Sequence, residues 1–297
     1  MPDAKLNIVI TGGTGFLGSH LVTSLIAAGH DVIVLKRSSS DTSRLAEVAG
    51  VRMFDVDVSG LNAPFDFIKA DIVLHAATNY GTKGEDGSFL LANNVQFPLE
   101  LLEASIRGGA KTFVNTDTSL HHFTNPYALS KLQFREWGRH LANQGGINFV
   151  NVRLEHMFGP RDNPSKFARR IIEQCLQNVP EIRLTQGDQK RDFIYIDDVI
   201  AAYMHILHAD PQTPYEEYEV GSGSAVSIRD FVQRVRQLTQ SSTTMNFGAI
   251  PYRTNEVMQS EANIQRLTEM GWSPRTGLND GLQKTIDHVR LHGVRNS

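Results

Sequence analysis

The sequence predicts an α/β protein with a Rossmann-like, doubly wound parallel sheet and a smaller C-terminal α/β lobe. Short apolar runs rich in β-branched residues alternate with longer stretches of helical periodicity, glycines directly follow the first run, and the alternation loosens after Gly159. Continuous apolar strands separated by helices are typical of a parallel sheet covered on both faces. We therefore expect a first domain over residues 1–160 and a second lobe over 161–297, some segments of which return to the first domain.

The expected strands are short apolar runs, and the expected helices lie between them. The strands span residues 7–11, 30–35, 51–58, 71–75, 111–115 and 148–153, and the helices span 15–28, 43–48, 93–107 and 126–143. Pro126 suits a first helical position after Asn125, which is a good N-cap. Glycines at 29, 108 and 145 follow helix ends, so the helix punctuation agrees with the alternation.

Composition excludes several classes of protein. With 297 residues, 40% hydrophobic and 21% charged, the chain has the composition of an ordinary globular protein rather than a disordered one. Its 29 basic and 32 acidic side chains give a net charge of −3, so we expect no nucleic-acid partner. The single cysteine, Cys175, excludes an intrachain disulfide and a cysteine-built metal site. Residues 1–7 show no secretory signal and no apolar run reaches the ~18 residues of a membrane span, so we expect a cytoplasmic protein with no membrane partner.

The glycine-rich stretch after the first strand predicts a dinucleotide site. Gly12 permits a tight turn, Gly15 lets the backbone approach a pyrophosphate, and Gly18 lets the following helix pack against the strand. The helix N-terminus supplies amide donors and partial positive charge to the diphosphate. An ordinary glycine-rich turn is the alternative, but the strand-before and helix-after context favours the cofactor. The residues expected to contact it here are Gly12, Thr14, Gly15, Phe16, Leu17 and Gly18.

The end of the second strand indicates which dinucleotide binds. An acidic residue there would favour NAD, whereas this chain has Lys36, Arg37 and Ser38. Two cations and a hydroxyl suit the 2′-phosphate of NADP, although a solvated basic turn would look the same. Asp57 and Val58, at the end of the third strand, are expected to flank the adenine. The expected cofactor is therefore NADP(H).

Tyr127 and Lys131 are the candidate catalytic pair. They lie at i and i+4 and so on one face of the helix over 126–143. A phenol with a pKa of ~10 is a poor acid–base group at neutral pH, and we expect the ammonium to lower that pKa. The pair could then exchange a proton with a hydroxyl or carbonyl oxygen while nicotinamide exchanges a hydride. The spacing alone is common by chance and gains its weight from the glycine turn.

Over nearly its whole length the chain resembles the extended short-chain dehydrogenase/reductase family of nucleotide-sugar epimerases, dehydratases and reductases. The motifs that carry the resemblance are TGGTGFLGSH at 11–20, DIVLHAA at 71–77, YALSK at 127–131, RLEHMFGPRD at 153–162, RDFIYIDDV at 191–199, PYRTNE at 251–256 and MGWSP at 270–274. Such a collinear set is highly specific for fold and cofactor and less specific for substrate.

The resemblance implies roles for further residues. A hydroxyl at the end of the fifth strand should hydrogen-bond the reacting sugar oxygen; Thr116 matches best, with Thr118 and Ser119 as alternatives. Asn94 matches an asparagine that supports a proton-relay water, although simple burial would explain it equally well. The remaining implied contacts are Ala76 and Ala77 with the cofactor, and Asp117, Thr118, Arg191 and Arg253 with the substrate.

Two of these assignments leave an alternative. Arg191 and Arg253 should grip the sugar-nucleotide diphosphate, but each could instead belong to a surface ion pair. Asp197 and Asp198 look like a metal pair, but the motif around them implies a structural cap, and no metal is expected.

Departures from the family pattern narrow the implied activity. Dehydratases place glutamate where this chain has Thr118, so elimination of water is not expected. The short separation of Thr116 and Tyr127 is most similar to the CDP-abequose and CDP-paratose synthase type of reductase. The implied function is NADPH-dependent reduction of the 4-keto group of a CDP-3,6-dideoxyhexose. The alternatives are a nucleotide-sugar 4-epimerase with tightly held NAD and a non-catalytic NADP-sensing regulator.

We also expect a homodimer. Family members commonly pair the helices that correspond to residues 93–107 and 126–143. In this chain those helices carry more apolar residues than one sheet contact requires, namely Leu99, Leu101, Leu102, Ile106, Leu132, Phe134 and Trp137.

Overall fold

The computed structural model describes residues 5–293, which form two compact units. The first unit comprises Met1–Leu154 and Tyr203–Tyr218, and the second comprises Glu155–Ala202 and Glu219–Ser297. Residues 1–4, part of the stretch considered above for a secretory signal, lie outside the described residues. The chain leaves the first unit at Leu154, earlier than the predicted boundary at 160, and returns to it at Tyr203.

A seven-stranded sheet is the centre of the first unit and confirms the predicted fold class. The strand order is β10-β6-β5-β4-β1-β2-β3, and the neighbours from β6 to β3 pair in parallel. The strands are β1 (Asn7–Thr11), β2 (Asp31–Lys36), β3 (Arg52–Asp55), β4 (Ile72–His75), β5 (Thr112–Thr118), β6 (Asn148–Leu154) and β10 (Tyr215–Val220). Because β1 lies between β2 and β4, the carboxyl ends of these strands meet beside the glycine turn.

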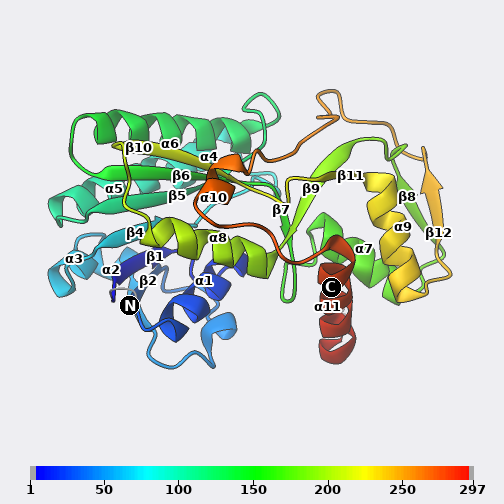
Figure 1. Cartoon of the computed structure of the whole chain (residues 1–297), viewed down its shortest axis with the longest axis horizontal. Coiled ribbons are helices and arrows are strands. Elements are labelled where there is room, and N and C mark those ends of the chain that lie inside the picture. The colour runs from blue at the N-terminus through cyan, green and yellow to red at the C-terminus, as the bar shows by residue number, and fades with distance from the viewer. Residues whose placement is uncertain (1–4, 294–297) are drawn as a thin grey trace. The chain divides into compact units, whose positions relative to one another are not determined.

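Helices cover both faces of this sheet, with α5 and α6 on one side and α1 on the other (Figure 1). The helical elements are α1 (Phe16–Ala27), the 3₁₀ turn η1 (Ser43–Leu45), α2 (Val56–Ser59), α3 (Ala63–Phe67), α4 (Gly87–Leu91), the π-helical η2 (Ala92–Gln96), α5 (Phe97–Arg107) and α6 (Pro126–Asn143). Helix α6 begins at Pro126 as predicted, and the Asn125 side chain accepts a hydrogen bond from the Ala128 amide at 2.8 Å.

Three elements differ from the prediction. The third strand stops at Asp55 rather than 58, because Val56 begins the short helix α2 and the Val58 side chain is 78% exposed. The helix expected over 43–48 is a single 3₁₀ turn. The helix expected over 93–107 is preceded by α4 and begins inside the π-helical turn η2, whose single buried residue is Asn94. Such turns occur frequently at functional sites.

The core of the first unit lies between the sheet and α6. Phe113 on β5 and Phe149 on β6 are fully buried and their rings stack at 5.6 Å. A Cβ at Gly138 of α6 would lie 2.2 Å from the Phe149 ring, so glycine lets the helix approach the sheet closely. This packing fixes the position of the helix that carries Tyr127 and Lys131.

The second unit is a smaller α/β assembly. It contains a three-stranded sheet of order β11-β9-β7 and a two-stranded sheet of β12 and β8. Its elements are β7 (His156–Phe158), α7 (Phe167–Leu176), β8 (Glu181–Leu184), β9 (Lys190–Tyr195), β11 (Ala225–Ser227), α9 (Ile228–Thr239), β12 (Thr244–Phe247), α10 (Gln265–Glu269) and α11 (Leu278–His292), and α8 (Ile196–His208) belongs to both units. None of the helices within residues 5–293 combines the length and the apolar character needed to cross a bilayer.

Candidate active site

The glycine turn after β1 is packed so tightly that two of its positions tolerate no side chain. Gly12 has a φ of +70°, and a Cβ there would lie 2.5 Å from the Ala77 amide nitrogen. A Cβ at Gly18 would lie 2.0 Å from the Gly12 carbonyl oxygen. A Cβ at Gly15 would approach that same oxygen at 3.1 Å and otherwise face open space. The turn therefore offers backbone and the α1 N-terminus on its open side, which fits a dinucleotide diphosphate.

The predicted cofactor residues at the end of β2 are mostly engaged with neighbouring carboxylates. Lys36 is ion-paired with Asp55. The Ser38 amide and hydroxyl donate to Asp57 at 2.8 and 2.7 Å, and these hydrogen bonds lower the pKa of that carboxyl. Arg37 is exposed, and its guanidinium has no partner within residues 5–293. Of the two predicted basic residues, Lys36 would have to leave Asp55 before it could bind a phosphate. Only Arg37 could bind a phosphate without breaking an ion pair.

A second cation near the glycine turn was missed from the sequence. Arg44, on η1, donates from Nη1 to the Thr14 carbonyl oxygen at 3.5 Å. No spacing rule marks this residue, because its approach to Thr14 depends on how the chain folds between β2 and β3. Arg37 and Arg44 are thus the cations to consider for a 2′-phosphate.

Tyr127 and Lys131 are both buried on α6, with 9% and 1% of their surfaces exposed. Burial raises the pKa of Tyr127 well above its ordinary value of 10.0, and the charges of Tyr80 and Asp117 raise it further. The hydroxyls of Thr118 and Thr78 act in the opposite direction and lower this pKa. The predicted lowering of this pKa by Lys131 is therefore wrong for the protein alone: the cost of burying a phenolate dominates, and Lys131 is not among the groups that shift this pKa.

The ammonium of Lys131 has no hydrogen-bond acceptor among the residues that the structure describes. Burial lowers the Lys131 pKa, and the charge of Asp117 partly offsets this effect. No side chain or carbonyl within residues 5–293 accepts a hydrogen bond from it. A buried ammonium prefers to be hydrogen-bonded, so ribose hydroxyls of a bound dinucleotide would suit it.

The two threonines at the end of β5 are directed to different partners. The Thr116 hydroxyl lies 2.7 Å from the Tyr203 phenolic oxygen, on α8. Thr118, the last residue of β5, instead lies near enough to Tyr127 for its hydroxyl to lower the pKa of that phenol. The structure therefore brings Thr118, rather than Thr116, to the candidate proton donor.

Asp117 belongs to a buried polar network rather than to an open pocket. Its carboxylate accepts from the Thr118 amide at 2.7 Å and from the Asn151 side chain at 3.0 Å. Arg135 lies 3.7 Å from it, and the same guanidinium approaches Glu217. With 4% of its surface exposed, Asp117 holds the end of β5 in place and is not positioned for the substrate contact implied above.

The Asn94 side chain makes all its hydrogen bonds with other residues of the protein. Its Oδ1 accepts from the Asn79 amide at 2.8 Å and from the Thr78 hydroxyl at 3.3 Å. Its Nδ2 donates to the Asn79 carbonyl at 2.8 Å and to the Ser130 hydroxyl at 3.0 Å. This leaves no donor or acceptor of the side chain for the implied relay water.

The two arginines implied for the diphosphate both lie in the second unit. Arg191 of β9 forms an ion pair with Glu256 at 2.6 Å. Arg253 is exposed. The pKa of the Arg191 guanidinium is lowered mainly by burial, and the positive charge of Arg253 lowers it further. In the same unit the Asp198 carboxylate accepts from the amides of Arg275 and Thr276, each at 2.9 Å, so it has the structural role implied above.

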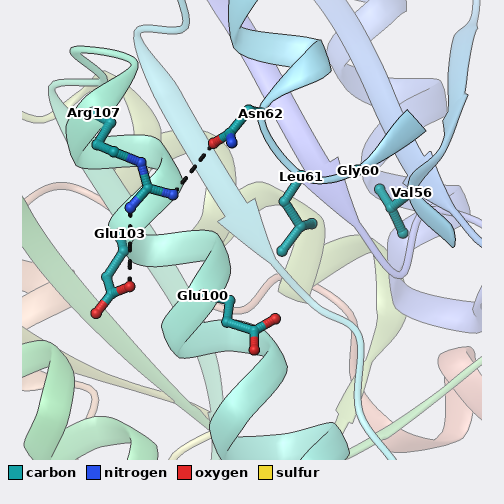
Figure 2. Close-up of a pocket in the computed structure, with 7 residues that line it drawn as sticks. All are labelled: Val56, Gly60, Leu61, Asn62, Glu100, Glu103 and Arg107. Atoms are coloured by element: carbon teal, nitrogen blue, oxygen red, sulfur yellow. Dashed lines mark hydrogen bonds and ion pairs between the residues drawn. The ribbon is translucent and has the colours of Figure 1, made fainter. Parts of the chain in front are cut away.

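A pocket of about 380 Å³ lies away from all these residues. Figure 2 shows Arg107 of α5 reaching both Asn62 and Glu103 at its rim. It is lined by Val56, Gly60, Leu61, Asn62, Glu100, Glu103 and Arg107. None of the predicted site residues is among them, so this hollow is separate from the candidate active site.

Comparison with known proteins identifies the family of the chain. The model of the NAD dependent epimerase/dehydratase family matches residues 8–221. The chain belongs to this family. It is 34% identical to the CDP-abequose synthase of Salmonella typhimurium over 97% of this chain and 100% of that protein. It is 31% identical to the CDP-abequose synthase of Salmonella muenchen over 96% of this chain and 99% of that protein.

Solved structures of the epimerase/dehydratase family share the fold of this member. The UDP-glucose 4-epimerase of Thermus thermophilus, in complex with NAD, superposes with a TM-score of 0.85 at 25% identity, covering 96% of this chain and 99% of that one. The UDP-glucose 4-epimerase of Thermotoga maritima has a TM-score of 0.86 at 24% identity, covering 97% and 99%. The family resemblance and the Rossmann-like fold predicted from the sequence are thus confirmed. The family depends on nicotinamide dinucleotides and modifies nucleotide sugars.

Proposed function

We propose that this epimerase/dehydratase-family member is an NADPH-dependent 4-ketoreductase of a nucleotide-activated deoxyhexose of the CDP-3,6-dideoxyhexose type. The observation that carries the proposal is the buried phenol of Tyr127, followed one helical turn later by the buried ammonium of Lys131. The nearby hydroxyl of Thr118 lowers the pKa of that phenol. Two relatives at 31% and 34% identity over nearly the whole chain are named CDP-abequose synthase, which supports this substrate class.

The residues present fit the dinucleotide that the family uses. Gly12, Gly15 and the α1 N-terminus would hold the diphosphate, and Lys131 would hold the nicotinamide ribose. When bound, the reduced nicotinamide supplies the hydride that carbon 4 of the sugar receives. Arg37 and Arg44 would neutralise the 2′-phosphate that distinguishes NADPH from NADH.

Tyr127 supplies the proton that balances the reaction. As the C4 carbonyl oxygen gains negative charge, Tyr127 Oη–H gives it a proton, and the carbonyl becomes a hydroxyl. The Thr118 hydroxyl donates to the same oxygen while that charge develops, which lowers the barrier. Thr118 takes the role that the sequence favoured for Thr116, because Thr116 is bonded to Tyr203.

The protonation state of Tyr127 is the one that a reduction requires. A ketone needs a protonated phenol as donor, and burial keeps this phenol protonated by raising its pKa. A 4-epimerase must first remove a hydroxyl proton, for which a phenolate is required. The 4-epimerase reaction with tightly held NAD remains the second candidate, because the solved Thermus thermophilus relative is a UDP-glucose 4-epimerase in complex with NAD. A non-catalytic NADP sensor would have no use for the buried tyrosine–lysine pair.

The deciding experiment is a reductase assay with product identification. The purified protein is mixed with NADPH and a CDP-4-keto-3,6-dideoxyhexose, and loss of absorbance at 340 nm is followed before the product is identified by NMR. We expect stoichiometric NADPH consumption and a 4-hydroxy sugar. Protein that contains bound NAD, consumes no NADPH and interconverts 4-hydroxy epimers would instead establish the epimerase.

The proposal includes a homodimer, with an apolar surface that shares only Trp137 with the residues expected above. Leu101, Leu102 and Phe134 are fully buried in the first unit, so the sequence argument that counted them as surplus is wrong. The exposed apolar residues on α4 and α6, which pack together, are Phe89, Leu91, Leu129 and Trp137. We expect light scattering to give the mass of a dimer and Trp137→Glu to give that of a monomer. A monomeric mass for the wild-type protein would overturn the proposed homodimer.

A further inference from the structure

Tyr80 lies directly beside the candidate proton donor, although the proposed mechanism does not use it. Its ring centroid is 5.0 Å from that of Tyr127, with the planes inclined by 44°. Tyr127 is buried, whereas 41% of the Tyr80 surface is exposed. The two phenols therefore form one aromatic surface, of which Tyr80 is the accessible part.

The backbone that carries Tyr80 is held to the helix that carries Tyr127. Asn94 bonds both the amide and the carbonyl of Asn79, and its Nδ2 also donates to Ser130 on α6. The Ser130 hydroxyl in turn donates to the Tyr127 carbonyl oxygen at 2.7 Å. One buried amide thus links the residue before Tyr80 to the backbone of Tyr127.

The residue after Tyr80 is fixed as well. Gly81 has a φ of +67°, and its amide donates to the Asn79 side chain at 2.8 Å. A Cβ at Gly81 would lie 3.2 Å from Leu90 of α4. Because the chain is constrained on both sides, the Tyr80 ring is a preorganised wall rather than the side chain of a loose loop.

When the carbonyl oxygen of a sugar reaches the Tyr127 hydroxyl, the ring carbons next to that carbonyl lie against the side chain beside Tyr127, which is Tyr80. An aromatic face accepts C–H groups well and leaves a hydroxyl without a hydrogen-bond partner. We infer that Tyr80 is a specificity-determining wall of the active site, which selects a hexose with no hydroxyl on the carbon beside the reacting carbonyl. This inference rests on the proposed function and extends it to one residue and one feature of the sugar.

The test compares two CDP-activated 4-keto-6-deoxyhexoses, one with and one without the 3-hydroxyl, as substrates with NADPH. For the wild type we expect kcat/KM to favour the 3-deoxy sugar by about ten- to a hundredfold, the range that an apolar contact provides. Tyr80→Phe keeps the ring and should keep the preference. Tyr80→Ala should reduce the preference at least about tenfold, chiefly through a higher KM for the 3-deoxy sugar.

Two controls separate selection from general damage. Tyr127→Phe should slow the reduction of both sugars equally and leave the preference unchanged. Phe67→Ala removes another exposed ring of the first unit without touching the site, so it should change neither the rates nor the preference. An unchanged preference in Tyr80→Ala with intact NADPH binding would overturn the inference and leave the proposed function standing. Loss of the preference in Tyr80→Phe would also overturn the inference, because the Tyr80 hydroxyl rather than its ring face would then discriminate between the two sugars. A wild type that reduces neither sugar would refute the proposed function, and the inference with it.

Discussion

The Thr116 hydroxyl and the Tyr203 phenolic oxygen lie 2.7 Å apart and satisfy each other inside the first unit. Tyr203 is fully buried, so this hydrogen bond is a structural one. Two residues along the same strand, the Thr118 hydroxyl lies near Tyr127 and lowers the pKa of its phenol. The chain thus offers a matched pair of threonines, one structural and one that we propose acts on the reacting oxygen.

Thr118→Val and Thr116→Val should therefore have opposite effects. We expect Thr118→Val to lower kcat by about 10²-fold with little change in stability, because it removes a donor to the developing charge. Thr116→Val should keep kcat within a few-fold and lower the free energy of unfolding by about 1–3 kcal/mol, since Tyr203 loses its partner. Steady-state kinetics and urea unfolding check both variants. A large loss of kcat in Thr116→Val alone would return the catalytic role to Thr116.

Tyr127→Phe should lower turnover by about 10²-fold or more while NADPH still binds, because it removes the proton donor and keeps the ring. Tyr203→Phe is the matched control, since it removes a buried phenol of the same unit without touching the site. Rapid-mixing kinetics and NADPH fluorescence titration give the two quantities. Near-normal turnover in Tyr127→Phe would remove this residue from the mechanism.

Arg37→Ala should weaken NADPH binding by about ten- to a hundredfold and leave NADH binding unchanged, because only NADPH carries the 2′-phosphate. Arg107→Ala, at the pocket of Figure 2, removes a cation of the same unit and should affect neither. Fluorescence titration with both dinucleotides measures the ratio of the dissociation constants. Equal weakening of both would mean that Arg37 does not contact that phosphate.

His75 should make stability depend on pH. Burial, aided by the charge of Lys131, lowers the His75 pKa well below 6.5, so the folded protein keeps this ring neutral. Below pH ~6.5 the unfolded chain protonates it, and stability should fall by about 1.4 kcal/mol per pH unit until the lowered pKa is reached. His75→Gln should remove this slope in urea unfolding between pH 6.5 and 5, whereas His121→Gln, at an exposed position, should retain it. An identical slope in wild type and His75→Gln would assign the pH dependence to other groups.

Gly18→Ala should distort the cofactor turn, because its Cβ would lie 2.0 Å from the Gly12 carbonyl oxygen. We expect a loss of about 1–3 kcal/mol in stability together with weaker NADPH binding. Gly87→Ala adds the same methyl group at the first residue of α4, where it would meet nothing within 4 Å. Thermal melts with and without NADPH compare the two, and equal melting shifts would contradict the steric argument.

The fold could be predicted well because its signals are local. The β1 strand, the glycine turn and the capped start of α6 each depend on residues close in sequence, and the structure has them where expected. The end of β3 was mispredicted because Val58 fits a strand by type, while its exposed position on α2 depends on the surrounding chain.

The candidate site could be predicted only in part, because side-chain direction is a property of packing. The spacing of Thr116 and Thr118 does not indicate that Thr116 hydrogen-bonds Tyr203, which is distant in the sequence. Arg44 and Tyr80 were missed for the same reason, since each meets the site through a turn that is formed by tertiary contacts. The direction of the Tyr127 pKa shift was mispredicted because helix geometry indicates a neighbouring cation but not the extent of burial.

The edge strand β10 comes from residues 215–220, far beyond the rest of its sheet, and the Phe149 amide donates to the Pro214 carbonyl at 2.7 Å. A polypeptide truncated at residue 160 would present β6 as an open edge with unpaired backbone groups, a template for aggregation. During synthesis the first unit cannot be finished when its first 154 residues have left the ribosome; it must wait for residue 218. The ribosome therefore synthesises the first segment of the second unit before the first unit has all its residues. The folding of the first unit is completed only after that segment has been made.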